Sequence, residues 1–468
     1  MTAAPDLEAP TVLDMLDRLR TGSVSARAVV TSALERCRQE QDLNAMISLR
    51  AEEALAEADE ADRQRTGGAL VGPLHGLPIV VKDNVAVGGW QFTGGSPALE
   101  GHVASADATV VAALRKAGAI VIGKSNLHEL ALGTTSNNAR FGPVRNPRDA
   151  NRTAGGSSGG SAAAIAEGFV TAAVSSDTGG SGRIPAAFCG CVGFRPTIGR
   201  YAGDGVLNIC PTRDTITTMA NSVADIALLD GVITGDRDAL QKISKPIRLG
   251  LLKPFAETDL DADVRAAFGA GVAALGYAGV EFVSVDGAEL LEIDLEIGFG
   301  IVAAESVRIW RKRAPEILGI SFEQFVERIG SPDVKGFLAS ASQPANEVSD
   351  ETYQRFITQR LPRLRAAYEE LFSTSGVDAF VFPTVPAVAP PVGEDETIVI
   401  DGKNFPLFPT TIRNTAPGTV AGVPGITLPL PVAAGKLPVG LALDAPSGSD
   451  RMLLSLAGTI EKLLAQKN

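Results

Sequence analysis

Two short apolar runs with a helical segment between them constrain the fold of this chain most strongly. The β-branched run Ile79–Val81 ends directly at Lys82, and a second apolar run follows at 119–122. Each run has the length and composition of a buried strand. Residues 107–117 predict a helix, for which Asp107 is the expected N-cap. Because strand, helix and strand alternate, the sequence predicts an α/β fold with a parallel sheet and helices on its faces.

The alternation extends on both sides of this unit. Residues 11–63 contain alanine-rich periodic segments, which predict N-terminal helices. Residues 161–168 predict another helix, and residues 170–175 predict the strand after it. The segment Ser222–Asp225 resembles a capping box, which indicates the start of a further helix.

The composition changes after about residue 240. Residues 245–395 contain fewer glycines and longer helical patterns, which indicate a helical insertion or cap. Residues 377–391 and 415–445 return to strand and proline patterning, so we expect them to rejoin the sheet. Neither an internal repeat nor a low-complexity linker interrupts the chain, which gives little support for a division into domains.

Composition and charge exclude several classes of partner. The 468 residues carry a net charge of −12, and Lys/Arg-rich tracts are absent, which argues against binding to a nucleic-acid backbone. No apolar run reaches the ~18 residues of a membrane span. The acidic N-terminus has no apolar signal segment, so we expect a cytoplasmic protein. The sequence leaves a homodimer open.

The four cysteines are too few for a disulfide framework in a chain of this length. Cys189 and Cys191 form a C-x-C pair with neither a second pair nor a histidine nearby. Small buried packing residues are therefore a better interpretation than a zinc site.

Two glycine-bracketed serines are the strongest chemical signal. Ser157 lies in GGSSGGS and Ser181 in DTGGSGR. Glycines permit backbone conformations that bring successive N–H groups into one concavity, and such a nest suits a developing oxyanion. The alternatives are a flexible loop for the first motif and a plain β-turn for the second.

Lys82 is the candidate base for these serines. If the strand before it is buried, desolvation lowers the pKa of the lysine and favours the neutral amine, which can accept a proton from a serine. The alternative is a lysine whose amine extends into solvent.

Residues 118–125, with the sequence GAIVIGKS, match the phosphate-loop pattern of nucleotide-binding proteins. A phosphate loop must follow its strand, whereas here the apolar residues 119–122 place a strand inside the pattern. Nucleotide binding is therefore a weak interpretation.

Six motifs occur in order along the chain: GPLHGLPIVVKDN, KSNLHELALGTTSNN, FGPVRNP, AGGSSGGSAAA, DTGGSGRIPAAFCGCVGFRPT and LPVGLAL. Together they resemble the amidase signature family, of which the chain is identified as a member. The match covers about 72–233 and returns at about 415–461. The resemblance implies one domain over 1–468, with N-terminal helices in 1–65 and a variable helical region at about 240–390.

The resemblance implies a fold, a site and a reaction. The fold is one mixed sheet of about eleven strands covered by helices on both faces. Ser181 is the implied nucleophile, Ser157 a bridging serine behind a cis peptide bond, and Lys82 the base. The implied oxyanion donors are the backbone N–H groups of Thr178, Gly179, Gly180 and Ser181. The reaction is hydrolysis of the C–N bond of a small-molecule amide through an acyl-enzyme, without metal or cofactor.

Within the family, the TRDT turn at 212–215 and the segment that follows it most resemble the corresponding parts of indoleacetamide and mandelamide hydrolases. Thr217 and Thr218 replace a glycine-proline pair of these relatives, and we expect this change near the substrate mouth. The substrate therefore stays open: an aryl amide, or a bulkier N-substituted xenobiotic amide or imide of the kind that iprodione hydrolases cleave. Apolar helical residues at 295–325 predict an acyl pocket, with core packing as the alternative role for its candidates Phe299, Ile301 and Trp310.

Two other functions remain compatible with the sequence. One is the A subunit of a tRNA-dependent glutamyl or aspartyl amidotransferase, which would work with a partner and ATP. The other is a non-catalytic binding protein on the same scaffold.

Overall fold

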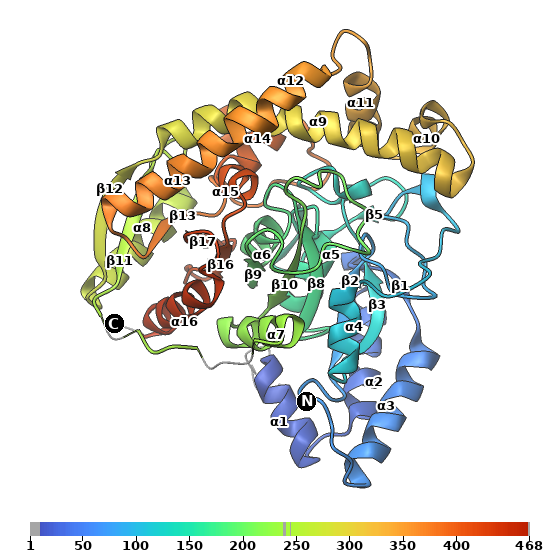
Figure 1. The fold of residues 1–468 in the computed structure, drawn as a ribbon. Helices are drawn as coiled ribbons and strands as arrows, with labels where there is room; N and C mark the ends of the chain where they lie inside the picture. Colours follow the sequence, from blue (N-terminus) through green and yellow to red (C-terminus); the bar gives the residue numbers. More distant parts are fainter. Residues whose placement is uncertain (1–9, 237–239, 244, 467–468) are drawn as a thin grey trace.

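One mixed sheet of eleven strands organises the molecule (Figure 1). The computed structural model describes residues 10–236, 240–243 and 245–466. Across the sheet the strands follow the order β1 (Met46–Leu49), β3 (Ile120–Ser125), β2 (Pro78–Lys82), β8 (Ala172–Asp177), β10 (Thr215–Ala220), β9 (Val192–Arg195), β16 (Gly425–Pro429), β17 (Gly440–Asp444), β13 (Ala379–Pro383), β11 (Arg248–Lys253) and β12 (Glu281–Asp286).

The sheet is parallel at two places and antiparallel between them. β2 pairs in parallel with β3 and with β8, and β11 pairs in parallel with β12 and β13. The strands β10, β9, β16 and β17 connect these parts through antiparallel pairs. The predicted α/β class and the sheet of about eleven strands are confirmed.

Side chains of the central strands alternate between two apolar cores. Ile79 and Val81 of β2 belong to one core, whereas Val80 belongs to the other. Successive residues of a strand point to opposite faces, so both faces of the sheet are covered. This double burial explains why the central strands read as continuous apolar runs.

Helices supply the other half of each core. The first core contains residues from α4 (Thr109–Lys116), α7 (Val223–Thr234), α8 (Ala262–Tyr277), α9 (Ala288–Leu318), α10 (Phe322–Arg328), α11 (Pro332–Ala341), α13 (Leu361–Ser375), α15 (Ala416–Ala421) and α16 (Asp450–Ala465). The second core contains residues from α2 (Ala26–Gln39), α3 (Ala51–Thr66), α5 (Gly159–Ala166) and α6 (Arg183–Cys189). Helix α1 (Val12–Thr21) contributes Val12 to the first core and Leu19 to the second.

A layer of helices lies beside the carboxyl-terminal half of the sheet. The long helix α9 contacts α10, α11, α13 and α12 (Asp350–Arg355), and α12 continues through a π-helical turn at Phe356–Arg360 into α13. In Figure 1 these yellow and orange helices form the upper border of the molecule. The helix α14 (Leu407–Ile412) follows the hairpin of β14 (Thr397–Ile400) and β15 (Lys403–Pro406). Two further short pairs precede α5, namely β4 (Asn137–Asn138) with β5 (Gly142–Pro143) and β6 (Arg145–Asn146) with β7 (Asp149–Thr153).

The structure adds two strands to residues 245–395, which were interpreted as a helical insertion or cap. β11 and β12 lie in this region and form one edge of the main sheet. Most residues of β12 are exposed or half-buried, as befits an edge strand, so the apolar signal of a central strand is missing. β1 was also not predicted, because it is only four residues long and lies between two helical patterns.

One of two predicted helix caps differs from the structure, and the other is confirmed. Helix α4 has Ala108 as its N-cap, while the Asp107 carboxylate accepts a hydrogen bond from the Gly88 N–H at 2.7 Å. The predicted cap at Ser222 is present, because its hydroxyl accepts the Asp225 N–H at 3.1 Å.

Candidate active site

Lys82 ends strand β2 inside the protein. Its side chain is fully buried, so the solvent-exposed alternative is wrong. Its Nζ lies within hydrogen-bond distance of the Ser157 Oγ, at 2.7 Å, and of the Ser176 Oγ, at 3.0 Å. Ser176 belongs to the neighbouring strand β8, and the Asn84 side-chain amide donates to the same hydroxyl at 3.0 Å. The lysine amine is therefore held by two serine hydroxyls from separate segments, and Asn84 fixes one of these hydroxyls.

Burial lowers the pKa of Lys82 from 10.5 to about 7, against the opposing attraction of the Asp177 and Asp214 carboxylates. Desolvation disfavours the charged ammonium, and neither carboxylate is close enough to form an ion pair with it. A substantial fraction of the amine is consequently neutral near pH 7. A neutral amine beside a serine hydroxyl can act as a proton acceptor.

Ser157 follows a close backbone passage before helix α5. The peptide bond between Gly156 and Ser157 is cis, as the family resemblance implied. A Cβ atom on Gly156 would lie 3.0 Å or less from backbone atoms of Thr134, Thr135 and Ser136, so a larger residue does not fit there. The Ser157 carbonyl also accepts the His128 N–H at 3.0 Å. These contacts fix the backbone on either side of the Ser157 hydroxyl.

The loop that carries Ser181 is folded around the carboxylate of Asp177. Asp177 accepts hydrogen bonds from the Gly180 N–H at 2.8 Å and from the Gly182 N–H at 3.1 Å. The Ser181 carbonyl accepts the Ser158 N–H at 3.3 Å. That bond joins the two glycine-serine segments, which are otherwise separated in the sequence.

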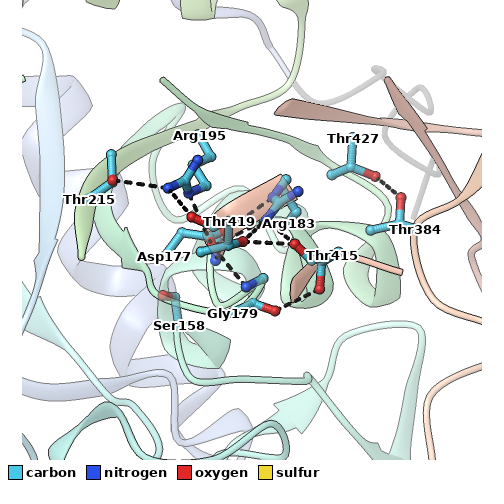
Figure 2. A network of polar contacts seen from close by, with 12 residues as sticks. Ser158, Asp177, Gly179, Arg183, Arg195, Thr215, Thr384, Thr415, Thr419 and Thr427 are labelled. Atoms are coloured by element: carbon cyan, nitrogen blue, oxygen red, sulfur yellow. Dashed lines mark hydrogen bonds and ion pairs between the residues drawn. The ribbon is translucent and has the colours of Figure 1, made fainter. Parts of the chain in front are cut away.

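Two buried arginines hold Asp177 in place (Figure 2). The Arg183 Nε lies 3.0 Å from the Asp177 Oδ2, and Arg195 approaches the same carboxylate at 3.8 Å. Burial opposes the charge of Asp177, but the two guanidiniums outweigh it and hold the pKa of this carboxyl below its usual value. Arg183 also donates to the Thr419 Oγ1 at 2.7 Å, and the Thr415 Oγ1 donates to the Gly179 carbonyl at 2.6 Å. The serine loop is thus tied to helix α15, far away in the sequence.

The oxyanion donors implied by the resemblance need one correction. The Gly180 N–H points at Asp177 and is already used. The N–H groups of Thr178, Gly179 and Ser181 have no hydrogen-bond partner within the described part of the chain. The Thr178 Oγ1 donates to the Asp214 Oδ1 at 2.7 Å, which fixes the start of the loop. Three free donors therefore remain, not four.

The three residues predicted to act together are brought close, with one link open. Lys82 reaches Ser157, and backbone bonds join the segments of Ser157 and Ser181. Among the hydrogen bonds of the described residues, none joins the two serine hydroxyls.

A cavity of about 640 Å³ lies beside the two serine segments, although Lys82, Ser157 and Ser181 do not line it. Thr134 lines it and packs against Gly156, while Ile412 lines it and lies 4.0 Å from the position that a Cβ atom on Gly179 would take. The aromatic lining residues are Phe299, Phe337, Phe405 and Phe408, and the ionisable ones include His128, Arg213, Asp294 and Asp333.

The structure corrects two of the three predicted pocket residues. Phe299 lines the cavity and is 61% exposed. Ile301 and Trp310 are fully buried in the first apolar core and do not line the cavity. Trp310 stacks on Phe325 with ring centroids 4.2 Å apart. For these two residues the alternative of core packing holds.

The change at Thr217 and Thr218 does not lie at the substrate mouth. Both side chains are fully buried on β10, and neither lines the cavity. The Thr217 Oγ1 lies 2.7 Å from the position that a Cβ atom on Gly182 would take. Thr217 therefore packs beneath the Ser181 loop.

The GAIVIGKS segment is not a phosphate loop. Strand β3 covers Ile120–Ser125, so its lysine and serine belong to a strand. The Lys124 Nζ lies 3.6 Å from the buried Asp83 carboxylate and also hydrogen bonds to the Val85 carbonyl. The C-x-C cysteines are fully buried, and burial raises the pKa of Cys191 to about 12.

Some functional neighbours were missed from the sequence. Ser176, Asn84 and Asp214 gave no recognisable signal, because each acts through a contact distant in the chain. Asp177 and Arg183 could have been found, since they begin and end the DTGGSGR motif.

Comparison with known proteins identifies the family. Residues 28–454 match the amidase family. The chain belongs to the amidase signature family. It is 35% identical over 451 residues to an indoleacetamide hydrolase of Rhizobium radiobacter, with 96% of each chain covered. It is 38% identical over 467 residues to a mandelamide hydrolase of Pseudomonas putida, with 96% of this chain and 90% of the relative covered.

Solved structures agree with this assignment. One crystal structure of an amidase superposes with a TM-score of 0.88 at 34% identity, covering 97% of this chain and all of the other. The chain is thus an amidohydrolase that acts on amide C–N bonds and is similar to indoleacetamide and mandelamide hydrolases. Within the described residues, no helix is both long and apolar enough to span a membrane.

Proposed function

We propose that this amidohydrolase cleaves small, aryl-containing carboxamides through a covalent acyl-enzyme. Ser181 is the nucleophile, Ser157 relays protons, and Lys82 is the base. The observation that carries the proposal is the buried Lys82 amine, with a pKa lowered by desolvation to about 7, at 2.7 Å from the Ser157 hydroxyl. Serine–lysine pairs activate hydroxyl nucleophiles in this way.

Acylation begins with the neutral amine. Lys82 takes the proton of Ser157, and Ser157 takes the proton of Ser181 as the Ser181 Oγ attacks the amide carbonyl carbon. This step requires the two serine hydroxyls to come into hydrogen-bond contact when substrate is bound. The short backbone connection between Ser158 and Ser181 keeps that movement small.

The tetrahedral intermediate carries a negative oxygen. The free N–H groups of Thr178, Gly179 and Ser181 are the donors available to it. Donors that are aligned before the reaction need no reorganisation during it, and loss of one typically costs ~10²–10³ in turnover. The Asp177 and Thr415 contacts hold this part of the backbone in place.

Collapse of the intermediate breaks the C–N bond. Ser157 gives a proton to the departing nitrogen and regains one from the Lys82 ammonium, so the amine leaves and Lys82 is neutral again. Water then attacks the acyl-enzyme ester by the same relay, which releases the carboxylic acid and restores Ser181.

The cavity supports an aryl substrate. Phe299 and Phe337 meet edge to face at a centroid distance of 5.5 Å, and Phe405 and Phe408 line the same cavity. Aromatic rings favour such offset and edge-to-face contacts. The names of the relatives, indoleacetamide and mandelamide hydrolase, denote aryl amides as well. A cavity of about 640 Å³ also has room for a bulkier N-substituted amide or imide.

The test is a panel of primary, secondary and aryl amides, with products measured by mass spectrometry. We expect primary arylacetamides or anilides to react first. Steady hydrolysis by the isolated protein would exclude the alternative of an amidotransferase A subunit, which needs its partner and ATP. Activity on glutamine together with inactivity on every aryl amide would overturn the proposal.

A further inference from the structure

Arg213 is a buried guanidinium without a protein partner. Its side chain lines the cavity, yet the residue is only 5% exposed. Its Nε and Nη1 are occluded and form no hydrogen bond with any described residue. Its Nη2 also has no such partner but is not occluded, so this nitrogen is the one open to the cavity. An unpaired buried guanidinium is costly, which indicates a site that a ligand completes.

Asp294 is the complementary acceptor on the opposite element. It lies on helix α9 and lines the cavity together with Leu291, Leu295, Gly298, Phe299 and Val302. This spacing of three and four residues is one face of a helix. The Asp294 Oδ1 is occluded and also has no partner among the described residues, while its Oδ2 is not occluded. Burial raises the pKa of Asp294 to about 6, with the Arg213 charge opposing that shift.

A gap separates the two side chains. Arg213 and Asp294 form no ion pair within 4.0 Å in the described structure. Both face Gly298: a Cβ atom there would lie 2.5 Å from the Asp294 Oδ1 and 3.6 Å from the Arg213 Nη1. The absence of a side chain at Gly298 therefore lets the Asp294 carboxylate pack against the helix backbone near Arg213, while the Asp294 Oδ2 and the Arg213 Nη2 stay accessible.

We propose that Arg213 and Asp294 form a polar subsite that binds a second, neutral carboxamide or urea group of the substrate. The carbonyl oxygen of that group accepts from Arg213, and its N–H donates to Asp294. Such a group offers an acceptor and a donor side by side, as the gap requires. A ligand carboxylate would also satisfy Arg213, but the Asp294 charge repels it. This inference rests on the proposed function, because it specifies the substrate of the same site.

The position of the subsite follows from the TRDT turn. Arg213 is adjacent to Asp214, whose carboxylate accepts the Thr178 hydroxyl at the start of the Ser181 loop. Asp214 also accepts the N–H groups of Ile209 and Cys210, both at 2.9 Å. One rigid turn thus places the polar subsite relative to the nucleophile. A second carboxamide at the matching distance from the scissile amide will align the substrate.

The first experiment compares three terminal groups on one aryl amide series. Each phenyl-substituted amide carries a methyl, carboxamide or carboxylate group, with linkers of one to four methylenes. At the best linker length, we expect kcat/KM for the carboxamide to exceed that for the methyl compound by about tenfold or more, as for hydrogen bonds to charged groups. The carboxylate compound is expected to react more slowly than the carboxamide. Equal rates for methyl and carboxamide at every length would overturn the inference while leaving the proposed function intact.

The second experiment uses variants to locate the preference. Arg213→Met is expected to reduce the carboxamide-to-methyl ratio of kcat/KM about tenfold. Asp294→Asn keeps an acceptor but removes the charge, so it is expected to raise the carboxylate-to-carboxamide ratio about tenfold. A merely structural role of Asp294 would not produce this change in selectivity. Arg328→Met, an exposed arginine outside the cavity, is the matched control and is expected to leave both ratios unchanged.

Gly298→Ala gives an independent test that does not remove a charge. Alanine is well accepted in a helix, but its methyl group would collide with the Asp294 Oδ1, which lies 2.5 Å from the Cβ position, and would displace that carboxylate. The carboxamide preference is expected to fall with little change in thermal stability. A preference that persists in both Arg213→Met and Gly298→Ala would overturn the inference.

A binding measurement separates failure of the subsite from failure of the proposed function. Ser181→Ala protein is titrated calorimetrically with the best carboxamide compound and its methyl counterpart. Tighter binding of the carboxamide that is lost in the Ser181→Ala/Arg213→Met double variant supports the subsite, even if the wild-type protein hydrolyses neither compound. Equal binding of the two compounds overturns the subsite, whatever the activity.

Discussion

The Lys82 amine nitrogen lies 2.7 Å from the Ser157 hydroxyl oxygen, in a position from which solvent is excluded. Neither residue alone provides this contact between an amine and a hydroxyl. The strand β2 brings the lysine from one side of the sheet, and the close passage at Gly156 brings the serine from another segment. Ser176 completes the arrangement by contacting the amine from the neighbouring strand, and the Asn84 amide donates to the Ser176 hydroxyl. The chemistry of the site depends on this contact.

The pH dependence of catalysis should report the titration of Lys82. Burial lowers the pKa of Lys82 to about 7, and in the proposed mechanism the active form is the neutral amine. The amine is protonated below this pKa and neutral above it, so kcat/KM for an aryl amide should rise with pH through about 7. A stopped-time assay between pH 5 and pH 9 measures the profile. A profile that is still rising at pH 9, toward the ordinary lysine pKa of 10.5, would contradict the role of a desolvated base.

Substitution of the serines should separate the nucleophile from its neighbours. Ser181→Ala removes the proposed nucleophile, so turnover should fall to background and labelling by a fluorophosphonate probe should be lost. Ser157→Ala interrupts the proton relay and should reduce kcat by at least ~10²-fold, the lower range for general acid–base catalysis.

Ser158→Ala is the matched control for these variants. Its hydroxyl donates only to the Ser176 carbonyl, at 3.2 Å, so its loss should cost about 1 kcal/mol of stability. Its kcat should stay within about tenfold of wild type, which corresponds to about 1.4 kcal/mol of activation free energy. Near-normal hydrolysis by Ser181→Ala would refute the assignment of the nucleophile.

The parts of this molecule that the sequence could predict are those with local signals. Continuous apolar runs predicted β2 and β3, because a strand buried on both faces has no polar alternation. The glycines around Ser157 and Ser181 predicted tight backbone loops for the same local reason. The contact of Lys82 with Ser176 could not be predicted, because it joins residues 94 positions apart through strand pairing.

The error at Ile301 and Trp310 has a physical origin in helix periodicity. Helix α9 places Leu291, Asp294 and Gly298 on its cavity face, whereas Ile297 and Ile301 lie on its core face. Both faces contain apolar residues, so hydrophobicity alone could not distinguish them. The charged Asp294 was the available sign of the cavity face, because an aspartate is almost never fully buried in a core without a partner.

The two aromatic residues of α9 should respond differently to truncation. Phe299→Ala removes an exposed ring from the cavity, so KM for an arylacetamide should rise about 3–10-fold. Burial of an aromatic ring contributes about 1–3 kcal/mol, and the substrate ring loses part of this contribution when Phe299 is absent. The loss of stability should be small, because the Phe299 ring is exposed. Trp310→Ala should instead lower stability by about 3–5 kcal/mol, as for other buried aromatic side chains. Michaelis–Menten kinetics and urea unfolding of both variants test the contrast. A Trp310→Ala protein of wild-type stability with a raised KM would show that this residue contacts the substrate and does not act through core packing.

Replacement of the base should stabilise the folded protein in a pH-dependent manner. Lys82 has a pKa of about 7 when folded and 10.5 as its ordinary value, so between these values the unfolded chain binds more protons. Stability therefore rises with pH across this window, and the destabilising effect of Lys82 is largest below pH 7. Lys82→Met should be inactive, and its gain in the free energy of unfolding should be larger at pH 6.5 than at pH 9.5. Urea titrations at both pH values give the comparison, and an equal gain at both would show that the amine is not desolvated.

Asp177 should be essential for the stability of the serine loop as well as for its shape. Its carboxylate binds the N–H groups of Gly180 and Gly182 and faces the buried guanidiniums of Arg183 and Arg195. Removal of one partner from a buried ion pair leaves an uncompensated charge, which typically costs about 3–5 kcal/mol. Asp177→Asn should lose stability in this range and should also lose turnover, because the freed loop no longer directs its N–H groups at the oxyanion.

Asp17→Asn removes an exposed carboxylate that pairs with Arg20 at 2.7 Å, and as a matched control it should change stability by no more than about 0.5 kcal/mol. Urea unfolding and kcat, measured on the same preparations of both variants, give the comparison. An Asp177→Asn protein with the stability and turnover of Asp17→Asn would show that the Asp177 carboxylate does not organise the loop.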